Sequence, residues 1–111
     1  MPDGQVQLFI EMFRKLCEIG NVYLVKDRTK NKEFLEKIGW LPEDVINYLY
    51  ENLSIEHYYS GPANDIDKRH KPGVIYVFLV PLEEYLVYVK IKKIEGEFQA
   101  VVISFHEEGR W

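Results

Sequence analysis

The clearest hydrophobic pattern in the chain is the strict alternation of apolar and polar residues across residues 86–106. A period of two residues is typical of β-strands that bury one face. We interpret this stretch as a β-hairpin whose turn lies near Gly96. In its first arm the residues of one face are Val87, Val89 and Ile91, and those of the other face are Tyr88, Lys90 and Lys92.

The length of the turn decides which side chains of the two arms share a face, because a slip of one residue turns a whole strand over. A two-residue turn pairs Lys90 with Val101 and mixes polar with apolar faces. A three-residue turn over residues 94–96, with Gly96 in the left-handed conformation, pairs Lys90 with Ala100 instead. We adopt this second register. It predicts one shared face for Tyr88, Lys90, Ser104 and His106.

Apolar residues in the N-terminal half recur every three or four positions, which predicts amphipathic helices. The first helix spans residues 5–19 and stops at Gly20. A short helix within residues 26–39 ends at Gly39, and we interpret the charges that precede it as solvated surface. A third helix begins at Pro42, because proline suits the first helical position.

The remaining segments complete a fold of the α+β class. Residues 21–26 are predicted to form an edge strand, and the apolar run 74–80 a central strand that is covered on both faces. Residues 61–73 combine turn residues with charges and are predicted to form a loop. We therefore expect a single domain, residues 1–111, in which N-terminal helices pack on a small antiparallel sheet.

Composition and charge narrow the function. Of 111 residues, 47% are hydrophobic and 29% are charged, which is typical of a globular chain and excludes a disordered one. The lone Cys17 cannot form an internal disulfide, and the sequence has no signal peptide or long apolar run, so we expect a cytoplasmic protein without membrane association. The formal net charge of −4 argues against a general nucleic-acid binder. Local clusters, however, set the field that a ligand meets.

The candidate chemistry lies on the hairpin. The histidines lack the spacing of zinc ligands, and residues 64–67 lack the glycine and glutamate of a calcium loop, so we expect no metal and no other cofactor. An imidazole transfers protons near neutral pH, and a lysine stabilises charge that grows on a phosphate. These groups suffice for RNA cleavage without a metal. The predicted catalytic residues are His106, Tyr88 and Lys90.

Further residues are candidates for RNA binding. The predicted loop contributes cations that suit a phosphate backbone, and an exposed tyrosine can stack on an unpaired base. The predicted RNA-binding residues are Tyr59, Lys68, Arg69 and Lys71, and His70 lies among them. A structural explanation competes with this one, because tyrosine and lysine often occupy the solvent face of a sheet and protect it from aggregation. The residue types alone favour that structural explanation.

Three short motifs change this balance when they are considered in order. They are YYSGPAND at residues 58–65, VYVKIK at 87–92 and ISFHE at 103–107. Together they resemble the MqsR family of type II toxins, which are messenger-RNA interferases of the RelE-like superfamily, and the resemblance extends from about Phe34 to Glu108. By position, Tyr88 matches the active-site tyrosine of the family, and His106 stands where the type member has a functional lysine.

The resemblance implies a RelE/MqsR-like fold, metal-independent cleavage of mRNA through the 2′-hydroxyl, and a cognate antitoxin with a zinc-binding domain and a helix-turn-helix domain. In this hypothesis the toxin inhibits translation, with His106 as general acid or base, Lys90 or a cation of the predicted loop stabilising the phosphorane, and Tyr88 positioning it. The alternative is a non-catalytic protein-interaction module with the same fold. Ser60 and Val77, which replace a lysine and a glutamine of the type member, favour that alternative, as does the acidic net charge.

Overall fold

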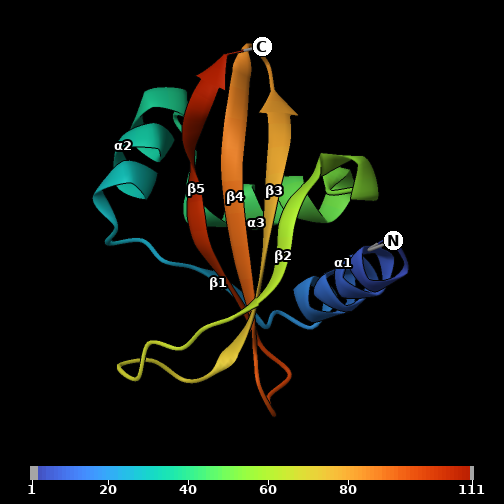
Figure 1. Cartoon of the computed structure of the whole chain (residues 1–111). Coiled ribbons are helices and arrows are strands. Elements are labelled where there is room, and N and C mark those ends of the chain that lie inside the picture. Colours follow the sequence, from blue (N-terminus) through green and yellow to red (C-terminus); the bar gives the residue numbers. More distant parts are fainter. Residues whose placement is uncertain (1–2, 111) are drawn as a thin grey trace.

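The chain folds as a set of helices followed by a sheet, in a computed structural model that describes residues 3–110 (Figure 1). Met1, Pro2 and Trp111 of the expected domain lie outside the described residues. The helices are α1 (Asp3–Glu18), α2 (Thr29–Ile38) and α3 (Pro42–Asn52), followed by a 3₁₀ turn at Ile55–His57. The strands are β1 (Val22–Leu24), β2 (Tyr58–Asn64), β3 (Gly73–Leu82), β4 (Tyr85–Ile94) and β5 (Ala100–Arg110). The predicted α+β class is confirmed.

The five strands form one mixed sheet in the order β1-β5-β4-β3-β2. Strands β2 to β5 are antiparallel, whereas β1 runs parallel to β5. The prediction of a purely antiparallel sheet is therefore wrong. The reason is that most of the chain separates β1 from β5, so no hairpin forces the two strands into opposite directions. The prediction that the first strand lies at an edge is confirmed.

Local signals in the sequence correctly predicted the C-terminal end of α2 and the N-terminal end of α3. Gly39 ends α2 in the left-handed conformation (φ 73°), and its N–H donates to the carbonyl of Leu35. Pro42 begins α3, and the backbone N–H of Leu41 donates to the carboxylate of Asp44 at 2.7 Å. These contacts satisfy backbone groups that a helix end leaves without partners. Within residues 3–110, no helix has the length and apolar character needed to cross a membrane.

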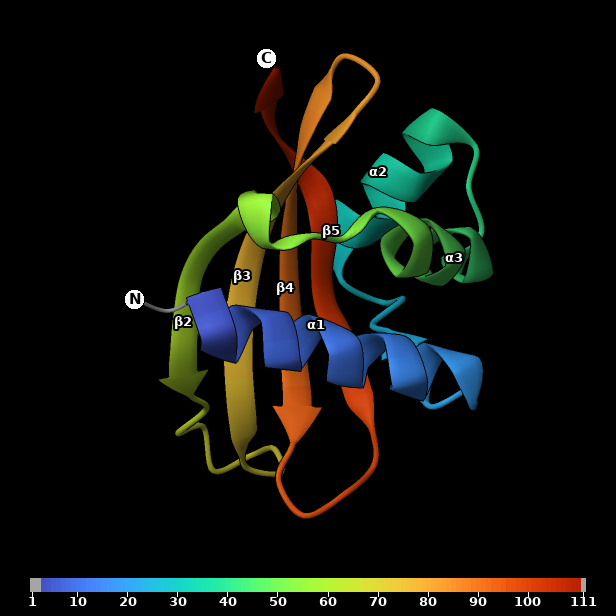
Figure 2. The same ribbon diagram turned by 90° about the vertical axis from the view of Figure 1, so that its right-hand side faces the viewer.

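The hydrophobic core lies between the helices and one face of the sheet. Figure 2 shows α1 crossing in front of the strands, and Phe9 of α1 packs its ring 4.3 Å from that of Tyr76. At the other end of the core, the ring of Phe34 lies 5.8 Å from that of Phe105. The prediction that both faces of β3 are covered is right only in part, because on the face opposite the core Val77 is buried but Leu79 is half-buried. We call that second face the open face.

The hairpin of β4 and β5 has the predicted faces but a different register. Gly96 has a positive φ of 75°, as predicted, yet the turn is longer, and the N–H of Ile94 donates to the carbonyl of Gln99. Lys90 pairs with Ser104, so the predicted pairing with Ala100 is wrong. The partner of Lys90 on β5 has moved by four residues. Because this shift is even, Lys90 still shares a face with Ser104 and His106.

A register shift in β5 explains the rest of the difference. The pairing changes phase between Lys90 and Ile91, opposite Ile103. This bulge lets Val102 and Phe105 both reach the core, although they are an odd number of residues apart. The sequence pattern had placed Val102 on the same face as Ser104, which is wrong. Strict alternation does not reveal such an extra residue.

The predicted loop at residues 61–73 is shorter in the structure. Strand β2 continues to Asn64, so the loop between β2 and β3 covers residues 65–72. The turn residues misled the prediction because β2 is an irregular edge strand with two register shifts. Gly61 has a φ of 113°, and a Cβ atom there would lie 2.6 Å from the carbonyl oxygen of Ile75. Glycine thus allows β2 to approach β3 closely at this point.

Candidate functional site

The open face carries two rows of directly paired residues. One row consists of Leu79, Tyr88 and His106, and the next consists of Ser60, Val77, Lys90 and Ser104. Residues that are directly paired across strands project from the same face of a sheet. The prediction that Tyr88, Lys90, Ser104 and His106 share one face is therefore confirmed, although the register that led to it is wrong.

The ring of Tyr88 stacks on the imidazole of His106. The ring centroids lie 5.3 Å apart, and the ring planes differ by 15°. Both side chains are half-buried, and Nδ1 of His106 lies 3.4 Å from the backbone carbonyl oxygen of Glu107. The stacked tyrosine limits the orientations of the imidazole, while its partial exposure leaves it accessible to a ligand. This arrangement suits a group that transfers protons at a fixed position.

These residues form one wall of a groove of about 650 Å³, which we call the first groove. The opposite wall is the segment that leads from β1 into α2. Its lining residues are Asp27, Arg28, Thr29, Lys30 and Asn31. Arg28 and Lys30 belong to the charges that we had interpreted as solvated surface, and both are indeed exposed, but they also line this groove. No local signal reveals them, because their position depends on the long-range pairing of β1 with β5.

Asn31 joins the two walls of the first groove. Its side chain is 1% exposed, and its amide nitrogen donates to the carbonyl oxygens of Val25 and Ile103, each at 2.9 Å. Its amide oxygen accepts a hydrogen bond from the backbone N–H of Phe105 at 3.0 Å. The bonded groups of β5 lie on either side of Ser104. Asn31 therefore holds α2 against the bulge that directs Ser104 and His106 to the open face.

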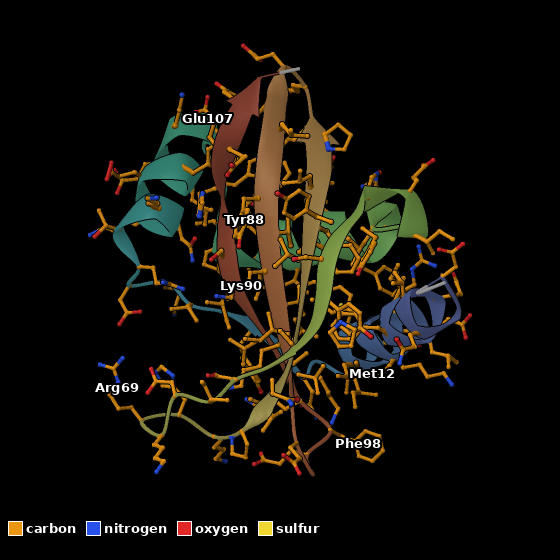
Figure 3. All side chains as sticks on the ribbon, viewed as in Figure 1. Met12, Arg69, Tyr88, Lys90, Phe98 and Glu107 are labelled. Atoms are coloured by element: carbon orange, nitrogen blue, oxygen red, sulfur yellow. The ribbon has the colours of Figure 1, made fainter. Side chains whose placement is uncertain are left out.

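A second groove of about 620 Å³ continues along the open face and shares Arg28 and Lys90 with the first. Its floor is apolar, and the loop at residues 65–72 forms its rim. The floor includes Ile75, Val101 and Ile103, and the rim includes Arg69, His70 and Lys71. Figure 3 shows Arg69 on this loop, well below Tyr88 and Lys90 on the sheet.

Two of the four residues predicted to bind RNA thus line this surface. Arg69 and Lys71 face the second groove, together with His70. Tyr59 and Lys68 are not among the residues that line either groove. Tyr59 is exposed on the distant edge strand β2, which is separated from β4 by β3. The predicted site residues therefore divide between the two grooves and surface outside them.

Several charged groups around the loop of the second groove are paired, whereas Arg28 and Lys90, which it shares with the first groove, are not. Lys92 is buried and donates to the carboxylate of Asp65 at 2.6 Å and to the backbone carbonyl of Lys71. Arg69 binds the carboxylate of Asp67, with the shortest contact at 2.8 Å. The hydrogen bond from Lys92 lowers the pKa of Asp65, and the hydrogen bond from Arg69 lowers the pKa of Asp67 to about 2.

Lys71 completes this set, because its ammonium pairs with the carboxylate of Glu97 at 2.8 Å. In the first groove, by contrast, Arg28, Lys30 and Lys90 form no ion pair with any residue in the range 3–110. Asp27 and Glu108 also line that groove, but they do not neutralise these cations directly. The first groove therefore offers positive charge that is available to an anionic ligand.

Comparison with known proteins adds no relative to this description. No family model, no curated protein and no solved structure matches the chain.

Proposed function

We propose that the protein is a RelE/MqsR-like toxin that binds mRNA along the open face and cleaves it without a metal, which inhibits translation. The observation that carries this proposal is the grouping of Tyr88, Lys90 and His106 in adjacent rows, opposite cations that form no ion pair with the residues that the structure describes. An enzyme that cleaves RNA needs a proton-transfer group and positive charge at the phosphate. The first groove holds both.

The reaction is an attack of a ribose 2′-oxygen on the adjacent phosphorus. The bond from phosphorus to the 5′-oxygen breaks, which leaves a 2′,3′-cyclic phosphate and a 5′-hydroxyl. One proton leaves the 2′-hydroxyl, and one proton reaches the departing 5′-oxygen. His106 serves as general acid or base for one of these transfers. Lys90 stabilises the negative charge of the phosphorane, and Tyr88 holds the imidazole in place through the stacked rings.

The second groove suits the neighbouring part of a single strand. Its apolar floor of Ile75, Val101 and Ile103 matches the faces of unstacked bases, while Arg69 and Lys71 on the rim can contact the backbone if RNA exchanges with their carboxylate partners. Both grooves meet at Arg28 and Lys90, so a strand that crosses this boundary contacts both. This continuity favours an extended RNA over a mononucleotide as the substrate.

The test is a single-turnover assay on an unstructured RNA in the presence of a chelator. We expect fragments that end in a 2′,3′-cyclic phosphate, and growth arrest when the protein is expressed in cells. We also expect a neighbouring gene to encode an antitoxin with zinc-binding and helix-turn-helix domains, and its co-expression to relieve the arrest. If the purified protein cleaves no RNA, with or without ribosomes, the catalytic proposal is wrong.

The alternative, a non-catalytic interaction module, is favoured by one specific observation. Ser60 and Val77 lie in the same row as Lys90 and supply neither a cation nor an amide there. A module of this kind would bind a protein partner such as an antitoxin, or RNA, and would not cleave the RNA. Binding of RNA without cleavage in the same assay would support it.

A further inference from the structure

The N-terminus of α2 opens into the first groove without a cap. Arg28 occupies the N-cap position and makes no side-chain capping bond, and the first turn contains no acidic residue. The first intrahelical bond runs from the N–H of Lys32 to the carbonyl of Arg28. The N–H groups of Thr29, Lys30 and Asn31 therefore have no acceptor within the helix, which spans ten residues. Such a helix end attracts anions.

Ser104 provides a second and independent observation. It is 5% exposed, it lines the same groove, and its hydroxyl makes no hydrogen bond to any residue in the range 3–110. The neighbouring buried polar side chains differ in this respect, because Asn31 and Lys92 are both hydrogen-bonded. Within the described residues, the one fully buried side-chain polar atom without a hydrogen bond is Oγ of Ser54, so the hydroxyl of Ser104 is open to the groove. A ligand bound in the groove can therefore form a hydrogen bond with it.

The helix end and the hydroxyl lie side by side. The side chain of Asn31, in the first turn of α2, bonds to backbone groups of Ile103 and Phe105, which flank Ser104. Figure 1 shows α2 beside β5 at the left of the sheet, whereas α1 lies at the lower right of the view. Lys90 is the direct cross-strand partner of Ser104, and Arg28 and Lys30 complete the lining. Five groups that can bind an anion thus line the same groove, namely the N-terminus of α2, the Ser104 hydroxyl and the side chains of Arg28, Lys30 and Lys90.

We infer that the N-terminus of α2 and the hydroxyl of Ser104 form a binding site for a phosphate group. The backbone N–H groups of the first turn and the Ser104 hydroxyl donate to the phosphate oxygens, and Arg28 and Lys30 supply the charge. This inference rests on the proposed function for the source of the phosphate, which is the scissile linkage of the RNA. The site also explains how the phosphate is held within reach of His106, two residues along β5.

The experiment is a titration of the protein with inorganic phosphate at constant ionic strength, followed through the amide NMR signals. We expect saturable shifts at Thr29, Lys30 and Asn31. Ser104→Ala removes one oxygen atom and should weaken phosphate binding about tenfold or more, as expected for a hydrogen bond to a charged group. Lys30→Gln should weaken binding as well. Lys32→Gln removes the same charge from α2 outside the first groove and should leave the affinity unchanged.

Shifts that do not saturate, or equal losses in Lys30→Gln and Lys32→Gln, would overturn the site. Should Ser104→Ala fail to fold, the comparison of the two lysine variants still decides the matter. The outcome also separates this inference from the proposed function. Saturable phosphate binding by a protein that cleaves no RNA supports the site and refutes the enzyme, whereas cleavage without phosphate binding does the reverse.

Discussion

The two grooves meet at Arg28 and Lys90, yet their charged groups are arranged in opposite ways. In the first groove the cations have no ion pair within residues 3–110, and the hydroxyl of Ser104 is open to the groove without a side-chain or backbone partner there. In the second groove Arg69 and Lys71 of the loop rim are each matched by a carboxylate, as in the pair of Arg69 with Asp67. The first groove is therefore suited to bind and act on an anion, and the second to keep its own shape.

The ion pairs of the second groove attach the loop at both ends. Lys92 binds Asp65 at the start of the loop, and Lys71 at its end binds Glu97 in the turn between β4 and β5. These bonds hold residues 65–72 over the apolar floor. The sequence predicted that Arg69 and Lys71 bind RNA. The comparison of the two grooves shows that both form ion pairs that stabilise the loop. Of the available cations in the first groove, Lys90 was predicted from the hairpin, whereas Arg28 and Lys30 lie in a segment that the sequence pattern did not single out.

The largest expected effect is on catalysis in the first groove. His106→Ala should lower the rate of RNA cleavage by about 10²–10⁴-fold, the usual range for the loss of a positioned acid or base. Tyr88→Phe should cost less, because the stacked ring stays and only a hydroxyl is lost. His70→Ala removes an imidazole from the second groove and should reduce the single-turnover rate only slightly. Equal reductions of the cleavage rate in His106→Ala and His70→Ala would mean that both grooves contribute to the chemistry, which would contradict the distinction between them.

A second effect concerns the connection between the walls of the first groove. Asn31→Ala leaves the N–H of Phe105 and the carbonyl of Ile103 without their partner, and each buried unsatisfied group costs about 1–3 kcal/mol. We expect the free energy of unfolding to fall by roughly 3 kcal/mol, measured by denaturant titration. Asn52→Ala, which removes an exposed bond within α3, is the control and should change little. A fully stable Asn31→Ala variant would refute this role.

Asn31 also marks the limit of what the sequence predicts. The faces of β4 follow from its alternation, and the ends of α2 and α3 follow from Gly39 and Pro42, because these signals are local. The first groove needs the parallel pairing of β1 with β5 and a side-chain bond from Asn31 to Ile103, across 72 residues. The bulge in β5 leaves no mark in the pattern of apolar residues. Half of the candidate site is thus local, and the other half depends on tertiary structure.

A third prediction concerns the salt dependence of RNA binding. Each phosphate contact that is lost reduces the slope of log affinity against log salt concentration by about 1. Replacing Arg28 and Lys30 by Gln should therefore flatten the slope by about 2. Replacing the three loop cations, namely Lys68, Arg69 and Lys71, by Ala should flatten it by less than three contacts would, because two of them are already paired with carboxylates. Fluorescence titrations at several salt concentrations measure both slopes.

The two slopes decide whether the grooves differ in the way described. A larger change for the loop variant than for the Arg28 and Lys30 variant would show that RNA displaces Asp67 and Glu97 from their partners. An unchanged slope in the loop variant would show that those cations do not contact the RNA backbone. Lys32→Gln again serves as the control, because it lies on α2 outside both grooves.

The smallest effect is a loosening of the loop in acid. A carboxyl whose pKa is lower in the folded protein stabilises the fold above its unfolded pKa, and this contribution is lost as the pH falls through the folded pKa. Arg69 holds the pKa of Asp67 at about 2, and Lys92 also lowers the pKa of Asp65. The ion pair within the loop and the one between the loop and β4 should therefore be complete above about pH 4 and decline toward pH 2. Amide hydrogen exchange at residues 65–72 measures this change, and Arg69→Gln should move the loosening of Asp67 to higher pH. If the protection of these amides from exchange already falls between pH 7 and pH 5, the proposed role of the ion pairs is wrong, because neither carboxyl gains a proton in that range.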